Sequence, residues 1–500
     1  MSSLQINPNL MVQYLQKPSS EFGKEDIIRY IEEREIEMLN FRYVAEDGKL
    51  KTINFMVTGK KDLDMILSSG ERVDGSSIFS FLEPNSSDLY LVPRYKTAFQ
   101  NPFSEIPSVD ILCSFFSGEG KPLESSPEYI LQKAVRRFFK ETGLKIKMMG
   151  ELEYYVISQT ENTHPLTSNG YQCSEPFTAH ENLRKEAIKL IARCGGKVRF
   201  AHSETGRFQI GNEIYEQHEI EFTAVEPEDA ADQLLIAKWI LRMLGQKYGV
   251  KLTFIPKISL DKAGSGLHYH YQIEKADKNI LIENDELSQT ALKTMAGILD
   301  LAPSLCAFGN TNPISYFRIL PGQKAARHIC WGYSNRSTLI RIPLGWNKNP
   351  NMAAILNHSD EQAETDFTFR QTIEYRGADG SSNPYLFSAA FIIAILKGLN
   401  GIGTADEAQK LKCTMNLFQQ TEETIGEKFN SLPMSCHEAA EKLEENRSIF
   451  EEDNVFTKTI INHMILKLRS FKDKEFSTNF ITYGENQEFK DLVKEYMNYM

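Results

Sequence analysis

The sequence has few cysteines, and nothing in their arrangement suggests a cross-link. Seven are spread over 500 residues, an odd count without a C-x-x-C pair. Disulfide frameworks need paired cysteines in a secreted chain, and structural zinc sites need closely spaced ones, so the sequence favours neither. We therefore expect reduced thiols in a cytoplasmic protein.

Long hydrophobic runs and a surplus of positive charge are also missing. The longest apolar run, Leu386 to Leu396, ends at Lys397 and is too short to cross a bilayer. Residues 1–16 lack the basic and apolar regions of a secretory leader. The net charge of −11 disfavours nucleic acid and anionic membrane as main partners, because both attract clustered cations. We expect neither partner.

The chain shows no internal repeat and no low-complexity tract, and it has no P-loop or kinase signature. Its hydrophobic fraction of 41% and charged fraction of 25% are typical of a globular protein. Because 500 residues exceed what one core usually serves, we expect two or three domains. A polar arm, a small sheet domain ending near Gly118 and a larger domain fit the order of the predicted elements.

The segment from Gly150 to Val156 is the strongest local feature. Its period-two pattern predicts a strand with Glu151 and Glu153 on one face and Leu152 on the other. Two carboxylates about 7 Å apart on a strand repel each other unless a positive charge lies near them. The pair is therefore either a solvated strand face or part of a site for a hard divalent cation.

Further acidic residues, one histidine and several arginines fall on or beside other predicted strands. The set comprises Glu151, Glu153, Glu204, Glu219, Glu374 and His268, with Arg318, Arg336, Arg341 and Arg376. Carboxylates with one imidazole suit two or three Mg²⁺ or Mn²⁺ ions rather than a structural zinc. Arginines suit phosphate oxygens and a substrate carboxylate. Together they indicate phosphoryl transfer from a nucleotide.

At this point the chain is identified as similar to glutamine synthetases of the bacterial type, across roughly residues 25–470. The matching runs, in chain order, are Val73-Asp74-Gly75-Ser76-Ser77, Gly150-Glu151-Leu152-Glu153, Gln217-His218-Glu219, Gly264-Ser265-Gly266-Leu267-His268-Tyr269-His270, Asn312-Pro313 with Arg318 and Pro321-Gly322, Asn335-Arg336-Ser337 with Arg341, Ile373-Glu374-Tyr375-Arg376 and Asn383-Pro384-Tyr385.

The resemblance implies an α+β fold. It comprises an N-terminal β-grasp-like domain and a C-terminal catalytic domain with a curved antiparallel sheet flanked by helices. We place the arm at residues 1–24, the β-grasp-like domain at 25–120, the catalytic domain at 121–470 and a charged tail at 471–500. The family forms homo-oligomers of two stacked rings, so a dodecamer is expected, with each active site between neighbouring subunits. Its reaction joins ammonia to glutamate with ATP, through γ-glutamyl phosphate.

The resemblance also assigns roles to residues. Glu153, Glu204 and Glu219 would hold one metal ion, and Glu151, His268 and Glu374 a second. The remaining roles are phosphoryl stabilisation by Arg336 and Arg341, glutamate binding by Gly264, Arg318 and Arg376, nucleotide binding by His270, Arg341 and Arg370, and ammonium binding by Asp74 from the next subunit.

Four positions depart from the family pattern. The chain is longer than usual between Glu204 and Glu219, with Gly211-Asn212 as a possible hairpin turn, so Glu213 competes with Glu204 as a metal ligand. Ala263 replaces an asparagine, Thr372 replaces an arginine, and Lys324 replaces the glutamate of a flap beside the ammonium site. Lys324 leaves three alternatives open: an ammonia ligase, a ligase for another amine, and an impaired paralogue with a regulatory or structural role.

Overall fold

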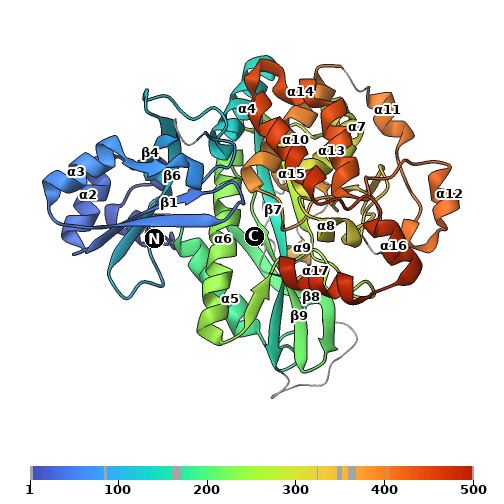
Figure 1. Cartoon of the computed structure of the whole chain (residues 1–500), viewed down its shortest axis with the longest axis horizontal. Helices are drawn as coiled ribbons and strands as arrows, with labels where there is room; N and C mark the ends of the chain where they lie inside the picture. The colour runs from blue at the N-terminus through green and yellow to red at the C-terminus, as the bar shows by residue number, and fades with distance from the viewer. Residues whose placement is uncertain are drawn as a thin grey trace.

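The computed structural model describes residues 4–83, 87–159, 170–323, 325–345, 352–358, 368–401 and 404–497. Two separate β-sheets organise these residues, a small N-terminal one and a larger central one (Figure 1). Helices flank both sheets, and a long helix, α6 (Pro227–Tyr248), lies between them in that view. The α+β class expected from the sequence is confirmed.

The small sheet has the order β2-β1-β6-β4-β3, with β5 added beside β6. The first two strands form an antiparallel hairpin, and β6 runs parallel to β1. Its inner face and helices α2 and α3 enclose a core that contains Phe41 and Ile111. The bounds are α2 Lys24–Glu33, β1 Met38–Val44, β2 Leu50–Met56, α3 Lys60–Ser69, β3 Glu71–Asp74, β4 Asp88–Pro93, β5 Phe99–Gln100 and β6 Ser108–Ser117.

The expected polar arm is partly structured. Helix α1 (Leu10–Leu15) begins at Asn9, whose side chain accepts hydrogen bonds from two backbone N–H groups of the helix. Met11, Val12 and Leu15 share one face and are buried in the N-terminal core. A single apolar turn in a polar context gave too weak a periodic signal to predict this packing.

The central sheet has the order β15-β16-β17-β11-β7-β9-β8, and every pairing in it is antiparallel except β15 with β16. β7 lies near its middle and carries the Gly150 to Val156 segment. Short strands β10 and β12 extend it. The bounds are β7 Lys145–Gln159, β8 Val198–Ile210, β9 Glu213–Phe222, β10 Lys251–Thr253, β11 Leu267–Lys275, β12 Lys278–Asn279, β15 Trp331–Tyr333, β16 Ile340–Ile342 and β17 Ile373–Tyr375, with a separate hairpin of β13 Ile282–Glu283 and β14 Glu286–Leu287.

A layer of helices supplies most of the large core. Helix α7 is long and apolar enough to span a membrane by length and composition, but 83% of its apolar window is buried inside the protein. It packs against α10, so it is a core helix of the part that the structure describes. The helices are α4 Pro127–Thr142, α5 Glu181–Arg193, α7 Gln289–Gly309, α8 Pro313–Arg318, α9 Met352–Leu356, α10 Pro384–Leu399, α11 Ala405–Lys410, α12 Glu422–Gly426, α13 Cys436–Glu445, α14 Arg447–Glu451, α15 Lys458–Ser470, α16 Phe476–Tyr483 and α17 Gln487–Tyr496.

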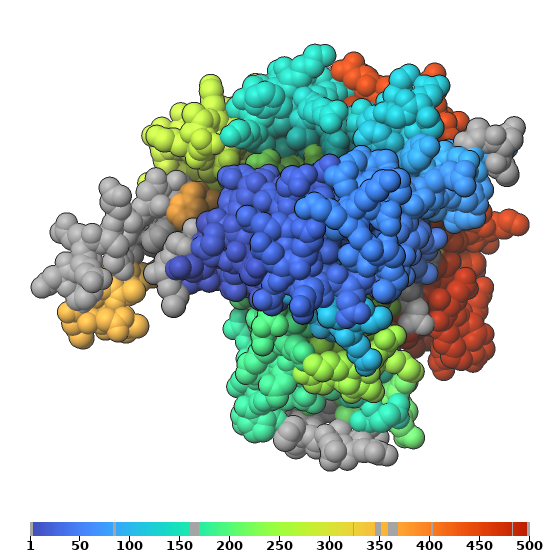
Figure 2. Space-filling view, turned by 90° about the vertical axis from the view of Figure 1, so that its left-hand side faces the viewer, coloured from blue at the N-terminus to red at the C-terminus, as the bar shows by residue number. Residues whose placement is uncertain are grey.

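The two sheet units meet through buried polar contacts. Arg94 donates to both carboxylate oxygens of Asp232 on α6, each at 2.9 Å, and the Tyr385 hydroxyl donates to the same carboxylate. A second contact joins Glu46 to His463 of α15, with 2.6 Å between Oε1 and Nε2. Figure 2 shows the N-terminal unit in blue, seated against the rest of the chain with a broad face open.

The Glu46 contact makes docking of the two units sensitive to acid. Burial opposes ionisation of Glu46, but hydrogen bonds from His463 and Ser80 outweigh it and lower its pKa to about 2. A carboxylate with a depressed pKa stabilises the folded state above its unfolded pKa of about 4.5, and this stabilisation is lost as pH falls towards about 2.

We predict that Glu46→Gln lowers the free energy of unfolding by about 1–2 kcal/mol at pH 7, a value discounted for partial solvent exposure. Urea titrations at pH 7 and pH 3.5 should show a smaller difference at the lower pH. Glu32→Gln removes an exposed ion pair with Lys60 and should change stability by less than about 0.5 kcal/mol. Equal losses in both variants would show that the Glu46 contact has no special role.

Candidate active site

Strand register brings the acidic residues together. Along β7, Glu151 is paired with His268 of β11 on one side and with Glu221 of β9 on the other. Glu153 is paired with Glu219 of β9. Leu152 and Tyr154, on the opposite face, are fully buried in the core. The period-two pattern therefore places the β7 carboxylates on the face that carries the cavities, as predicted.

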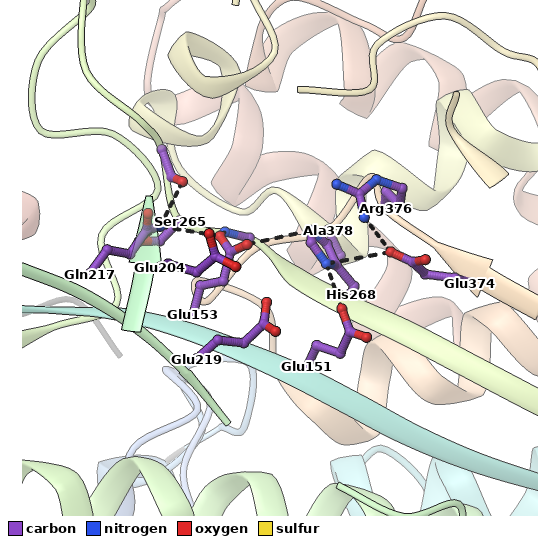
Figure 3. A network of polar contacts seen from close by, with 12 residues as sticks. Glu151, Glu153, Glu204, Gln217, Glu219, Ser265, His268, Glu374, Arg376 and Ala378 are labelled. Carbon is purple, nitrogen blue, oxygen red and sulfur yellow. Dashed lines mark hydrogen bonds and ion pairs between the residues drawn. The ribbon is translucent and has the colours of Figure 1, made fainter. Parts of the chain in front are cut away.

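His268 lies among three carboxylates (Figure 3). Its Nδ1 is 3.1 Å from Oε2 of Glu151 and 3.6 Å from Oε1 of Glu374, and its Nε2 is 4.0 Å from Oε1 of Glu153. The Glu153 carboxylate also accepts hydrogen bonds from the Gly266 backbone N–H and the Gln217 side chain. Strands β7, β11 and β17 thus supply one half of the site.

The other half comes from the β8–β9 hairpin, which turns at Gly211 with a φ of 59°. The pairing shifts register between Ser203 and Arg207, so Glu204 lies in a bulge. A bulge re-aims side chains, and this one places Glu204 at the cavity wall. Glu213, the alternative ligand, instead lies 3.1 Å from Lys251, and it lines neither cavity.

His202 is a site residue that the sequence reasoning missed. Its Nε2 is 3.3 Å from Oε1 of Glu219, and its Nδ1 is 3.9 Å from Oε1 of Glu204. The ring stacks on Phe200 with centroids 5.9 Å apart. Alternation along the strand pairs positions 202 and 204, and this signal could have indicated the residue.

Within the described part of the chain, three sets of side chains could each hold a cation, because their ligand atoms lie within 4.8 Å of one another. They are Glu151 with His270 and Glu374, Glu151 with Glu219 and His268, and His202 with Glu204 and Glu219. The sets differ from the expected pair of triads by including His270 and His202 and by leaving out Glu153. Thr372 orients His270, because its Oγ1 lies 2.8 Å from Nδ1 of the ring. The threonine that replaces the arginine of the family pattern therefore has a structural contact.

The carboxylates are too crowded for all of them to ionise without added positive charge. Burial, together with Glu151 and Glu153, raises the pKa of Glu219 well above its usual range. Burial and Glu153 also raise the pKa of Glu204. Burial opposes ionisation of Glu151, but His270 and His268 together outweigh it and hold that pKa low. Oxygen-rich, acid-crowded surroundings of this kind fit Mg²⁺ or Mn²⁺.

Arginines provide compensating charge at one end of the cluster. Arg341 Nη1 is 2.8 Å from Oε2 of Glu374, and Arg376 pairs with the other oxygen. The Nε atoms of Arg318, Arg341 and Arg376 are buried without a hydrogen-bond partner. Unsatisfied buried donors are costly, so these atoms are available to an anionic ligand.

Two adjoining cavities open on this wall. The first, of about 430 Å³, is lined by arginines and aromatic rings, and the second, of about 630 Å³, by lysine, arginine and backbone. Both share Glu151, Glu204, Glu219 and Arg336. The first is lined on its outer side by Arg199, Phe200, His270, Arg341, Arg370 and Thr372, and the second by Lys257, Ala263, Gly264, Arg318, Gln323 and Arg376.

The second cavity is positively charged on the side away from the carboxylates. Burial and the nearby Arg318 lower the pKa of Lys257 to about 8, and burial lowers the pKa of Arg318. A Cβ on Gly264 would lie 2.6 Å from the Pro256 carbonyl oxygen and 2.8 Å from Arg318 Cγ, so only glycine fits there. A small anion in this cavity would relieve the repulsion between the cations.

One expected site residue within the described part of the chain is not brought to the wall. Asp74 lines neither cavity, and hydrogen bonds from Ser77, Ser76 and Ser87 hold its pKa well below the usual range. Lys324 lies outside the described residues. Arg370 lines the rim of the first cavity and is exposed.

We predict that Glu219→Gln reduces stabilisation by Mn²⁺, because Glu219 belongs to two of the three candidate cation sets. The metal-free protein should be as stable as the wild type, or more stable, because the substitution removes the crowding that raises the pKa of Glu219. At a cation concentration 100 times its Kd, the wild type should gain about 2.7 kcal/mol. Thermal melts in EDTA and in Mn²⁺ measure both effects.

Glu213→Gln, on the same strand but facing Lys251, is the matched control and should respond to Mn²⁺ as the wild type does. A full Mn²⁺ response in Glu219→Gln would remove Glu219 from the cation site.

Known proteins match almost the whole chain. The family described as "Glutamine synthetase, beta-Grasp domain" matches residues 35–118, and "Glutamine synthetase, catalytic domain" matches residues 124–489. The glutamine synthetase of Methanococcus maripaludis is 28% identical over 482 residues, covering 94% of this chain and 99% of its own. That of Thermotoga maritima is 29% identical over 479 residues, covering 93% and 98%.

Solved structures show the same fold. A cryo-EM structure of Plasmodium falciparum glutamine synthetase superposes with a TM-score of 0.72 at 20% identity, covering 94% of this chain and 98% of that one. The structure titled "Apo GmaS without ligand" gives a TM-score of 0.71 at 17% identity, covering 94% and 99%. The N-terminal β-grasp domain and the catalytic domain with its curved sheet are therefore confirmed as the fold.

Proposed function

The chain belongs to the glutamine synthetase family of ATP-dependent ligases, and on that premise we propose that it joins an amine to the γ-carboxylate of glutamate through γ-glutamyl phosphate. One observation carries the proposal. The carboxylates form one wall shared by two cavities. One cavity is rich in arginine and the other contains the buried side chains of Lys257 and Arg318, so two anionic substrates can meet across the wall.

Glutamate fits the second cavity. Arg318 and Arg376 line it, each with a buried Nε that lacks a partner, and this supports assigning both to the carboxylate oxygens of glutamate. Gly264 leaves room beside Arg318 for the ligand. The γ-carboxylate would then face Glu151 and Glu219, and a cation is needed there to offset the repulsion.

ATP fits the first cavity, with its phosphates towards the shared wall. His270, Arg341 and Arg370 would contact the nucleotide, and Arg336 and Arg341 would stabilise charge on the transferring phosphoryl group. Two or three Mg²⁺ or Mn²⁺ ions would neutralise the phosphate oxygens, and their proposed ligands are Glu151, Glu153, Glu204, Glu219, His268 and Glu374. In this structure, the guanidinium groups of Arg341 and Arg376 supply positive charge beside Glu374.

The amine is the least constrained substrate. Lys324 replaces a flap glutamate, which changes the local charge by two units, and one unit charge at 4 Å contributes about 4 kcal/mol at an effective dielectric of 20. We therefore propose weak use of ammonium and test other amines beside it. An impaired paralogue is less favoured, because repulsion among the crowded carboxylates lowers stability unless bound cations offset it.

We predict ATP- and glutamate-dependent phosphate release with at least one member of an amine panel that begins with ammonium. Lys324→Glu should raise turnover with ammonium by restoring negative charge at the flap. The measurement is phosphate release at millimolar amine, with Lys490→Ala, an exposed substitution in α17, as control.

Rapid glutamine formation by the wild type, or no gain in Lys324→Glu, would show that the flap lysine does not control amine choice. Absence of release with every amine would contradict the ligase proposal.

Asp74 is proposed to serve a neighbouring subunit, within a homo-oligomer of stacked rings. It lines neither cavity of its own chain, and it belongs to the N-terminal unit whose outer face is open (Figure 2). A site that needs Asp74 must therefore obtain it from another copy.

We predict that Asp74→Asn and Glu153→Gln are each inactive and complement each other when mixed and reassembled. In a ring with random placement, about one quarter of the sites receive the wild-type residue at both positions. Activity of the mixed oligomers, with light scattering to confirm assembly, measures this. If the mixture stays inactive although hybrids form, or the protein is monomeric, the shared site is wrong.

A further inference from the structure

The segment expected to be a charged tail, residues 471–500, contains two helices, α16 and α17, that pack beside the active site. Helices α16 and α17, drawn in red in Figure 1, both contact helix α8. Their apolar side chains belong to a hydrophobic cluster separate from the main core, here called the C-terminal cluster. Its buried members are Tyr155, Ile157, Phe208, Tyr215, Ile255, Ile258, Ile314, Phe317, Leu320, Phe480, Phe489, Val493 and Tyr496.

The C-terminal cluster holds helix α8, which carries Arg318 at its last position. Phe317 packs against both Phe480 and Phe489, with ring centroids 5.1 and 5.4 Å away, and these two rings also contact each other. A six-residue helix is not stable by itself, so its position depends on this packing. Arg318 donates to the Gly377 and Ala378 carbonyl oxygens at 2.6 and 2.9 Å, which leaves its Nε for a ligand.

Polar contacts join the same helices to the loop that forms the other wall of the second cavity. Glu485, between α16 and α17, accepts hydrogen bonds from Ser259 Oγ at 2.7 Å and from the Leu260 backbone N–H. Thr253 Oγ1 donates to the Met497 carbonyl oxygen. Residues 253–260 are therefore tied to the C-terminal helices at both ends.

That loop in turn holds the groups that face the ligand. Lys257 Nζ donates to the Lys262 carbonyl oxygen at 2.6 Å and to the Gln323 side chain, which lies in the flap. Ser265 N–H donates to the Pro256 carbonyl oxygen at 2.9 Å, which fixes the turn that contains Gly264. Displacing residues 253–260 would move both Lys257 and the flap.

We propose that α16 and α17 position the glutamate-side wall of the active site, with Phe480, Glu485 and Phe489 as positioning residues for Arg318, Lys257 and the flap. The identity of the ligand rests on the proposed function; the mechanical link does not. None of the residues lining the first cavity is a member of the C-terminal cluster, although Tyr155, Phe208 and Tyr215 of the cluster lie on the strands that carry Glu151, Glu204 and Glu219. Helices α16 and α17 both contact α8, which carries Arg318, so we expect the larger effect on the glutamate side.

The first test is kinetic. Phe489→Ala should raise KM for glutamate roughly tenfold while KM for ATP stays within about twofold. Phe489→Leu should restore most of the difference because it refills the cluster. Phe450→Ala, an equally buried ring packed on Phe308 and Phe456, is the control for general destabilisation and should leave both KM values near wild type. Equal effects on both substrates, or none, would overturn the proposal.

The second test needs no turnover. Hydrogen exchange of the intact, ligand-free protein should show faster exchange at residues 255–266 and 317–323 in Glu485→Gln and Phe489→Ala than in wild type, and unchanged exchange at residues 199–202 and 268–272. Glu488→Gln, an exposed carboxylate on the same segment, is the matched control. Unchanged exchange at residues 255–266 and 317–323 would overturn the positioning role, whereas an inactive wild type with the expected exchange pattern would overturn the proposed function alone.

Discussion

Repulsion among buried carboxylates is the constraint on which the active site depends. Cross-strand pairing places Glu151, Glu153 and Glu219 on one face of two neighbouring strands, with Glu204 brought in by a bulge in a third. Burial strengthens the repulsion, because the protein interior screens charges less than water does. The raised pKa of Glu219 is the direct result, and divalent cations are the simplest way to offset it.

The sheet meets this constraint by placing histidine and arginine side chains at the borders of the cluster. His268 and His270 lie on β11, next to Glu151, and the guanidinium groups of Arg341 and Arg376 pair with Glu374. The cluster therefore forms a wall with an arginine-rich cavity on one side and a lysine- and arginine-lined cavity on the other. The arrangement suits two anions that react across a set of cations. The C-terminal helices mainly support the second side.

The sequence revealed those parts of the structure that depend on local periodicity. Alternation placed Glu151 and Glu153 on one face. The ends of the Pro227–Tyr248 helix also carry local signals, a proline at its first turn and Gly249 after its last residue. His202 was missed because a single imidazole becomes significant only once β8 is paired with β9. Helices α1, α16 and α17 were missed because their apolar faces are too short to give a clear periodic signal. Tertiary packing, which the sequence does not show locally, stabilises them. The bulge that aims Glu204 inward has no signature that local reasoning could detect.

Isotope transfer tests the central claim most directly. Glutamate labelled with ¹⁸O in its γ-carboxylate is incubated with ATP, Mg²⁺ and an accepted amine, and the released phosphate is examined by mass spectrometry. If the γ-carboxylate attacks the phosphoryl group across the carboxylate wall, each phosphate carries one labelled oxygen from glutamate. Phosphate released at the same rate without the label would contradict the account.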